Sequence, residues 1–133
     1  YMEHTIKTTS RDEMINITKF IQDDANNSKI KDGFVIVMVP HTTAGVTINE
    51  NADPDVVYDI LNSLRKIFPN DSSQHHMEGN SDAHVKASMM GSSCTVMVEG
   101  GKLKLGTWQG VYLCEFDGPR TRTFHTKFMG QIE

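Results

Sequence analysis

The sequence predicts an α+β fold, with a mostly antiparallel sheet of about seven strands and two main helices. Apolar, β-branched runs recur along the chain, most clearly in Phe34-Val35-Ile36-Val37-Met38-Val39. Turn signals such as Gly100-Gly101 and Asp117-Gly118-Pro119 separate the last runs by the short distances of hairpins. No glycine-rich strand-to-helix turn of the Rossmann type is present. With 133 residues, we expect residues 1–133 to form one compact domain.

The first half of the chain predicts four strands and one short helix. The strands are expected at residues 3–9, 14–18, 34–39 and 42–49. The run at 34–39 is apolar at every position, which predicts a central strand covered on both faces. Pro40 ends this strand because proline cannot donate to the hydrogen-bond ladder. Between the second and third strands, Thr18 is expected to cap a helix that extends to Asn26.

The clearest helix start is Asp53-Pro54-Asp55, where Asp53 can cap and Pro54 suits the first helical position. Apolar residues then recur at three-and-four spacing, which predicts one stripe facing the core; they are Val57, Ile60, Leu61, Leu64, Ile67 and Phe68. A shorter helix is expected over residues 84–90. The remaining strands are expected at 94–99, 107–116 and 121–129.

Composition narrows the class of protein. The formal net charge of −4 provides no basic field for nucleic acid. No apolar run approaches the roughly 20 residues that a membrane helix needs, and no signal segment opens the sequence. Cys94 and Cys114 lie inside apolar runs, which favours two buried thiols in a reducing compartment. We therefore expect a cytoplasmic protein with neither a membrane nor a nucleic acid as its partner.

The segment from Gln74 to His84, QHHMEGNSDAH, is the densest in reactive side chains. It holds three imidazoles and two carboxylates, and only Met77 and Ala83 are apolar, so it cannot belong to the core. A loop that gathers metal-binding and proton-transferring groups is a candidate site. A second dense segment, from Pro40 to Glu50, adds one more histidine and one more glutamate.

Two chemistries suit these side chains. A divalent ion such as Zn²⁺ or Mg²⁺ requires three or four ligands converging from different parts of the chain, and the candidates are His41, His76, His84 and Glu78, with Asp82 as a further carboxylate. The spacing matches no named zinc signature. Acid–base catalysis needs a histidine near neutral pH and a carboxylate that fixes its tautomer, and the candidates are His84, Asp82, Glu50 and His41. The alternatives are surface histidines, above all His75, and a helix-entry role for Glu50.

A phosphate group and a flat ring have their own candidates. Ser92, in Gly91-Ser92-Ser93, offers a hydroxyl, and Arg120 and Arg122 are expected on one face of a strand, where two guanidiniums suit a phosphate. Trp108 could stack on a heterocycle, although a lone tryptophan in a strand more often packs or contacts a second subunit.

Several of these motifs together resemble the YjbQ family of small bacterial and archaeal proteins. The resemblance rests on His41-Thr42-Thr43-Ala44-Gly45-Val46-Thr47-Ile48-Asn49-Glu50-Asn51-Ala52-Asp53-Pro54, Glu78-Gly79-Asn80 with Ala83-His84, Gly91-Ser92-Ser93, Leu105-Gly106-Thr107-Trp108-Gln109-Gly110-Val111 and Asp117-Gly118-Pro119-Arg120-Thr121-Arg122. It covers residues 34–128, and residues 2–32 match loosely. Asp82 directly precedes Ala83-His84 here, whereas some relatives carry extra residues in this loop.

The resemblance implies a homotrimer of an α+β fold with a low thiamine-phosphate synthase activity, in which pyrophosphate is displaced. The family's candidate positions fall on His41, Glu50, His76, Glu78, Asp82, His84 and Arg120. The function predicted is that of a cytosolic trimeric enzyme with a histidine and carboxylate site for a metal and a small phosphorylated metabolite. The alternative is a non-catalytic module that binds a metal or a phosphorylated metabolite.

Overall fold

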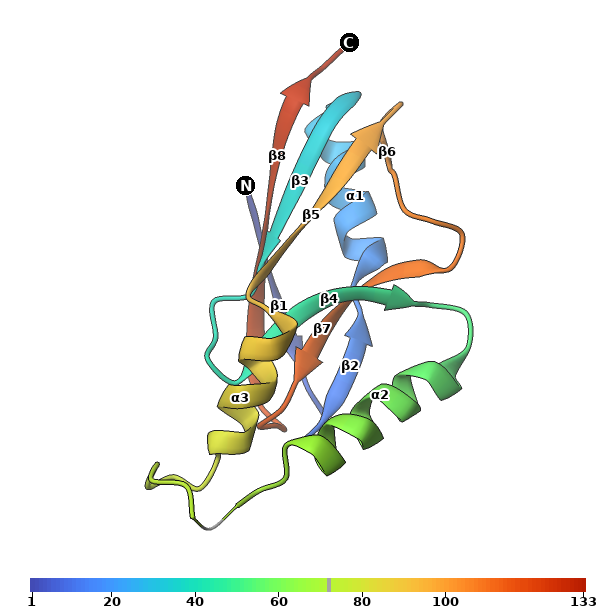
Figure 1. Cartoon of the computed structure of the whole chain (residues 1–133). Helices are drawn as coiled ribbons and strands as arrows, with labels where there is room; N and C mark the ends of the chain where they lie inside the picture. The colour runs from blue at the N-terminus through green and yellow to red at the C-terminus, as the bar shows by residue number, and fades with distance from the viewer. Residues whose placement is uncertain (72) are drawn as a thin grey trace.

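Two antiparallel sheets and three helices make up the fold in the computed structural model, which describes residues 1–71 and 73–133 (Figure 1). In chain order the elements are β1 (Met2–Lys7), β2 (Glu13–Asn16), α1 (Thr18–Ser28), β3 (Asp32–Met38), β4 (Ala44–Glu50), α2 (Pro54–Ile67), α3 (Ser81–Met90), β5 (Ser93–Glu99), β6 (Lys102–Leu103), β7 (Gln109–Glu115) and β8 (Thr121–Gln131).

The larger sheet has the strand order β1-β8-β3-β5-β6, and the smaller sheet has the order β2-β7-β4. The predicted α+β class with antiparallel strands is therefore confirmed. The described residues form eight strands rather than about seven, because β6 was not expected. This short strand pairs with β5 across Gly100 and Gly101, and both glycines have positive φ, as a tight hairpin turn requires.

The main core fills the space between the two sheets. Val35 and Val37 of β3 face Val111 and Leu113 of β7, and Ile21 of α1 packs into the same cluster. Figure 1 shows α1 beside the larger sheet, where it covers the face that carries the core. Burial of these side chains is the main force that holds the sheets together.

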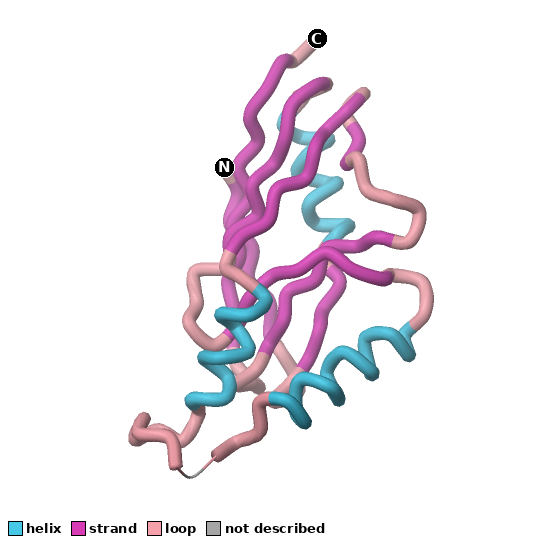
Figure 2. The backbone as a smooth tube through the Cα atoms, in the orientation of Figure 1, coloured by secondary structure: helices cyan, strands magenta, loops and turns pink. Residues whose placement is uncertain are grey.

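A second core lies on the other face of the smaller sheet. Tyr112 and Cys114 of β7 meet Leu61 of α2 and Ala83 and Ala87 of α3. Strand β7 is thus covered on both faces, which explains why its residues from Gly110 to Glu115 are all buried. Figure 2 shows α2 and α3 beneath this sheet.

The strand at residues 34–39 was predicted to be covered on both faces, but the described residues leave the second face of the larger sheet uncovered. β3 is central, between β8 and β5, yet it is covered on one face only. Phe34, Ile36 and Met38 are exposed, and Phe34 is flanked in register by Met97 and Met129, which are also exposed. A run that is apolar at every position therefore does not mean two covered faces within one chain, because a strand can present its second apolar row to the surface.

The helix starts are set by local hydrogen bonds. The Asp53 side chain accepts from the Asp55 amide at 2.9 Å, with Pro54 at the first helical position, which confirms the predicted start of α2. At α1 the predicted cap was wrong. Thr18 is inside the helix, and its amide and hydroxyl both donate to the Asn16 side chain. No helix formed by the described residues is long and apolar enough to cross a membrane.

The two cysteines are free, and their thiols are shielded. Cys114 is buried in β7, and Cys94 is partly buried in β5. Burial raises the pKa of Cys94 to about 11, and burial together with the nearby Cys94 raises the pKa of Cys114 to about 12. Such thiols are poor nucleophiles near neutral pH.

Candidate functional site

A cavity of about 500 Å³ lies where the start of β4 meets α3. His41 enters it from the loop after β3, and His84 enters it from α3. Its full lining is His41, Thr42, Ala44, His84, Ala87, Ser88, Gly91 and Ser92. Two imidazoles that are distant along the chain therefore line one cavity, which we call the histidine cavity.

The ring of His41 is fixed from one side. Its Nε2 accepts a hydrogen bond from the Thr123 amide of β8 at 2.9 Å. An Nε2 that accepts leaves the proton of the neutral ring on Nδ1. Burial lowers the pKa of His41, and the positive charge of Arg122 lowers it further. His41 is thus held neutral in a single tautomer at neutral pH.

A buried ion pair fixes the loop that carries His41. The Arg122 guanidinium donates to both carboxylate oxygens of Glu115 and to the Thr43 hydroxyl, the last at 2.7 Å. Thr8 also donates to Glu115 at 2.8 Å. Burial alone would raise the pKa of Glu115, but hydrogen bonds from Arg122, the Asp117 amide and Thr8 outweigh it and lower that pKa. The pair therefore stays charged and ties β8 to the segment that presents His41.

Glycine makes the close contact between β4 and the end of α3 possible. A Cβ atom on Gly45 would stand 2.7 Å from the carbonyl oxygen of Gly91, which is closer than such atoms approach. The same carbonyl accepts from the Val46 amide at 3.0 Å. Gly91 itself has a φ of 99°, a conformation that favours glycine. The HTTAGV and GSS segments therefore form one wall of the histidine cavity.

His84 has a second imidazole beside it. The rings of His76 and His84 meet edge to face, with their centroids 5.2 Å apart. Glu78 is exposed, and its carboxylate lies 4.0 Å from His76 Nε2. Nowhere among residues 1–71 and 73–133 do three His, Cys, Asp or Glu side chains gather closely enough to hold a metal ion. The predicted ligands His41, His76, His84 and Glu78 thus do not form a complete set within one chain.

Asp82 faces away from the histidine cavity. Its carboxylate, 1% exposed, accepts from both terminal nitrogens of Arg11, at 3.1 and 3.2 Å, and from Lys86 Nζ at 3.2 Å. Burial opposes the charged form, but these hydrogen bonds prevail and the pKa of Asp82 is lowered. An ionised carboxylate held by two cations does not orient His84, which is the role expected for it from the sequence.

Arg120 and Arg122 do not form the expected pair. Arg122 is 3% exposed and bound to Glu115, whereas Arg120 is 50% exposed and bound to Asp117 at 3.0 Å. The alternation rule fails because Arg120 precedes β8, which begins at Thr121. Of the three residues expected to hold phosphate, Ser92 alone lines the histidine cavity.

Glu50 and Trp108 lie at the opposite end of the smaller sheet. A strand rises about 3.3 Å per residue, so Glu50 stands about 20 Å from Ala44, which lines the cavity. Glu50 accepts from the Ala52 amide at 3.0 Å, consistent with the helix-entry alternative. Trp108 is exposed, and its carbonyl accepts from the Asn51 amide at 2.8 Å. Within one chain, neither side chain reaches the histidines.

Three features of the histidine cavity were not expected from the sequence. The Thr123 amide binds His41, Glu115 anchors Arg122, and the Ser88 hydroxyl donates to the His84 carbonyl at 2.9 Å. Glu115 could have been recognised as a charged residue inside an otherwise apolar strand, because buried charges are normally paired. The amide of Thr123 carries no sequence signal.

The fold and the cavity define an α+β protein with two antiparallel sheets and a histidine-lined site between a strand start and a helix. Comparison with known proteins narrows this class: the family described as UPF0047 protein YjbQ-like matches residues 2–131. The chain belongs to the YjbQ family.

Similar proteins span nearly the whole chain. The UPF0047 protein MJ1081 of Methanocaldococcus jannaschii is 51% identical and aligns over 96% of this chain and 93% of its own length. The UPF0047 protein YugU of Bacillus subtilis is 54% identical over 94% of this chain and 96% of its own. A crystal structure of a YjbQ/UPF0047 family protein from Clostridium acetobutylicum is similar at a TM-score of 0.95 and 53% identity, covering 97% of this chain and 100% of that one.

Proposed function

We propose that the protein is an enzyme that acts on a small phosphorylated molecule, and that the histidine cavity is its catalytic site. The observation that carries the proposal is the convergence of His41 and His84, from two distant segments, on one cavity. A cavity of about 500 Å³ has the size typical of sites for small ligands.

The two histidines have different environments, which suits them to different roles. His41 is neutral, with its proton on Nδ1, so it can donate a hydrogen bond to a substrate. His84 lines the cavity from α3, and its ring contacts the ring of His76. A pair of groups in distinct environments is the arrangement expected for acid–base catalysis.

Nearby positive charge supports an anionic substrate. Arg122 and Arg120 both lower the pKa of His41 through their charge. The Ser92 hydroxyl lines the same cavity. In the pyrophosphate-displacing transfer that the family resemblance implies, a new bond forms to the substrate carbon as its bond to the pyrophosphate oxygen breaks. We assign His84 the role of giving a proton to the departing pyrophosphate, and the Ser92 hydroxyl, which lines the same cavity, the role of donating a hydrogen bond to it.

Single substitutions test this proposal. Formation of thiamine phosphate is measured with purified wild-type protein and with the His84→Asn and His41→Asn variants. A general acid or base typically contributes about 10²–10⁴-fold, so we expect losses of about 100-fold or more in kcat. The control is His75→Asn, which removes an exposed imidazole outside the cavity and is expected to retain activity. Full activity in both cavity variants would contradict the proposal, and saturable binding of the substrates without turnover by wild-type protein would favour the alternative of a binding module.

We also propose that three copies of the chain assemble through the exposed face of the larger sheet. Phe34, Met97 and Met129 form an apolar row there, and Ile36 and Met38 extend it. A continuous apolar surface of this kind favours burial against another protein. Light scattering should give three times the 14.9 kDa chain mass. Ile36→Lys should lower this mass, and the control Met77→Lys, which changes an exposed side chain of the α2–α3 loop, should leave it unchanged.

A further inference from the structure

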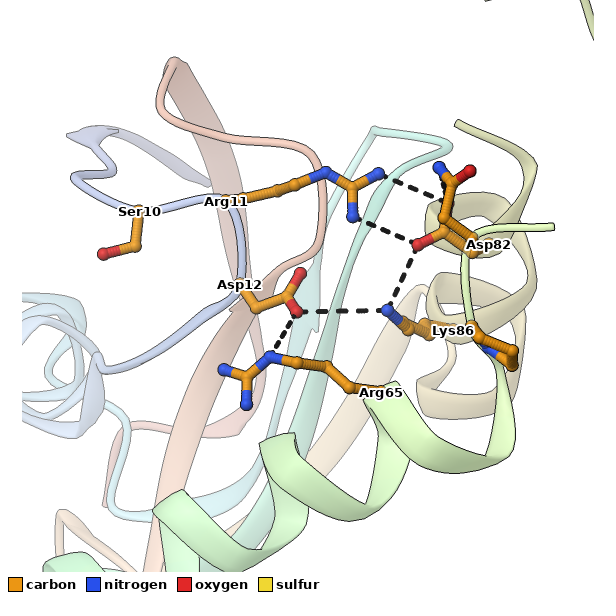
Figure 3. Close-up of a pocket in the computed structure, with 8 residues that line it drawn as sticks. Ser10, Arg11, Asp12, Arg65, Asp82 and Lys86 are labelled. Carbon is orange, nitrogen blue, oxygen red and sulfur yellow. Dashed lines mark hydrogen bonds and ion pairs between the residues drawn. The ribbon is translucent and has the colours of Figure 1, made fainter. Parts of the chain in front are cut away.

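We propose a second binding site, for a phosphate group that carries or adjoins a hydroxyl, in the cavity between the β1–β2 loop and the ends of α2 and α3. This cavity of about 540 Å³ is lined by Ser10, Arg11, Asp12, Arg65, Pro69, Asn70, Asp82 and Lys86. Figure 3 shows Arg11, Asp12, Arg65, Asp82 and Lys86, which come from three separate parts of the chain, pointing toward one another, whereas the Ser10 side chain points away from them. We call it the arginine cavity.

Five charged side chains form an unbroken series across the arginine cavity (Figure 3). Arg11 binds Asp82, Asp82 binds Lys86 at 3.2 Å, Lys86 lies 3.9 Å from Asp12, and Asp12 binds Arg65 at 3.0 Å. Signs alternate, and the series begins and ends with arginine. Three cations therefore share two carboxylates, which leaves one positive charge in excess. Lys86 lies between the two carboxylates and is 2% exposed, whereas Arg11 and Arg65 at the ends are 43% and 47% exposed, so the accessible positive charge lies at the ends of the series.

Donors for an anion remain available at one end of the series. Arg65 donates through Nε to Asp12, and neither of its terminal nitrogens donates to another residue in the described part of the chain. Guanidinium groups with free terminal N–H groups are suited to bind phosphate oxygens. Arg11, at the other end of the series, lines the same cavity.

One acceptor in the arginine cavity also lacks a partner. Asp12 is 9% exposed, and its Oδ1 is buried without a hydrogen bond from any residue in 1–71 or 73–133. Its other oxygen, Oδ2, binds Arg65. A buried carboxylate oxygen without a donor is costly, so a ligand that supplies a hydroxyl here would gain affinity. An anion without a proton would instead face an unpaired negative oxygen.

These two features together select the ligand. The excess positive charge favours binding of an anion. The unpaired Asp12 Oδ1 favours an anion that can donate a hydrogen bond to it. Hydrogen phosphate provides both at neutral pH, and so does a phosphate monoester whose organic part carries a hydroxyl. Sulfate provides the charge but no proton. The site therefore favours phosphate over sulfate through one hydrogen bond to Asp12.

The arginine cavity is separate from the histidine cavity. Lys86 and Asp82 face the first, and His84 and Ser88 line the second, so α3 forms a wall of both. An experiment can therefore disprove phosphate binding in the arginine cavity without disproving catalysis in the histidine cavity, and the reverse also holds.

NMR titration of the isotope-labelled protein near pH 7 tests the site. Inorganic phosphate, glycerol 3-phosphate and sulfate are added separately at constant ionic strength, and the signals of Arg65 Nε–H and the Asp12 amide are followed. We expect saturable shifts with both phosphates and an affinity for sulfate that is weaker by about tenfold or more. A lower dissociation constant for glycerol 3-phosphate identifies a phosphate ester as the ligand. A lower dissociation constant for inorganic phosphate identifies the free ion.

Two variants and two controls make the result specific. Arg65→Met should weaken phosphate binding by about tenfold or more, because it removes the free guanidinium N–H groups. Asp12→Asn should abolish the preference for phosphate over sulfate, because the side-chain NH₂ group of asparagine can donate a hydrogen bond to an oxygen of either anion. Lys19→Met, which removes an exposed cation on α1, should change neither quantity. His84→Asn should leave the Arg65 shifts intact, whatever its effect on catalysis.

Three results would overturn the proposal. They are the absence of saturable Arg65 shifts at millimolar phosphate, an equal loss of binding in Lys19→Met, and an undiminished phosphate preference in a folded Asp12→Asn protein. Circular dichroism establishes that each variant is folded. If Arg65→Met unfolds, Arg65→Lys replaces it and is expected to bind phosphate more weakly, because lysine cannot present two parallel N–H groups.

Discussion

Asp82 and His84 lie two positions apart on α3 and line different cavities. Residues at i and i+2 of a helix do not face each other, so the helix directs the carboxylate to Arg11 and Lys86 and the imidazole to the side of His41. The short segment that is richest in reactive side chains therefore contributes to two cavities. Reactive side chains are dense in this segment because the first turns of α3 form a wall of both the arginine cavity and the histidine cavity.

His41 is predicted to titrate below its ordinary pKa of 6.5, because burial and the charge of Arg122 disfavour the imidazolium. The unfolded chain then takes up the proton first as the pH falls. The contribution of His41 to stability is therefore complete above about pH 6.5 and declines as the pH falls through the lower, folded pKa. NMR titration of the His41 ring checks the first statement. A His41 pKa at or above 6.5 would contradict it.

The buried and exposed arginines should differ in their effect on stability. Arg122→Met leaves the Glu115 carboxylate buried without its cation, and such a loss costs about 3–5 kcal/mol. Arg120→Met removes a half-exposed pair with Asp117, which is worth about 0–1 kcal/mol. Urea denaturation at neutral pH measures both free energies of unfolding. Equal losses in the two variants would show that the Arg122–Glu115 pair does not anchor the loop of His41.

Gly45→Ala is expected to destabilise the protein by about 1–3 kcal/mol, because the added methyl group meets the Gly91 carbonyl oxygen and forces β4 away from α3. The same movement should reduce activity in the histidine cavity. Gly106→Ala is the matched control, since its added atom meets only the flexible side chain of Gln109. Thermal denaturation of both variants is the measurement, and an unchanged melting temperature in Gly45→Ala would disprove the close contact.

Both thiols should resist modification in the folded protein. With pKa values of about 11 for Cys94 and about 12 for Cys114, almost no thiolate exists at about pH 8. A colorimetric thiol reagent should therefore react slowly with native protein and release two equivalents of chromophore per chain once the protein is unfolded. Rapid reaction of one native thiol would show that it is more accessible than the structure indicates.

Structural features that depend on a few adjacent residues were predicted correctly from the sequence. Asp53 and Pro54 start α2, and Gly100-Gly101 makes the β5–β6 hairpin, because capping and tight turns depend on a few adjacent residues. The pattern also led to the expectation that His41 and His84 meet, and they line one cavity. The Thr123 amide that fixes His41 comes from β8 and could not be inferred from spacing.

Charged groups were the harder part to predict. Arg11 binds Asp82 across 71 positions, and only the fold brings these side chains together. The spacing of Asp82 and Lys86 by four residues was a readable signal for a pair on one helix face, which would have separated Asp82 from His84. The exposure of the row at Phe34 could not be predicted, because an apolar residue can face a core or the surface.

The most direct test of the central claim is a double-mutant cycle for His41 and His84. Thiamine-phosphate formation is measured for His41→Asn, His84→Asn and the double variant, with His75→Asn as the control. If the two imidazoles act together in one cavity, the double variant should lose no more of its kcat/KM than the worse single variant does. Losses that multiply in the double variant would show that the histidines act independently, and the account of a shared catalytic site would be wrong.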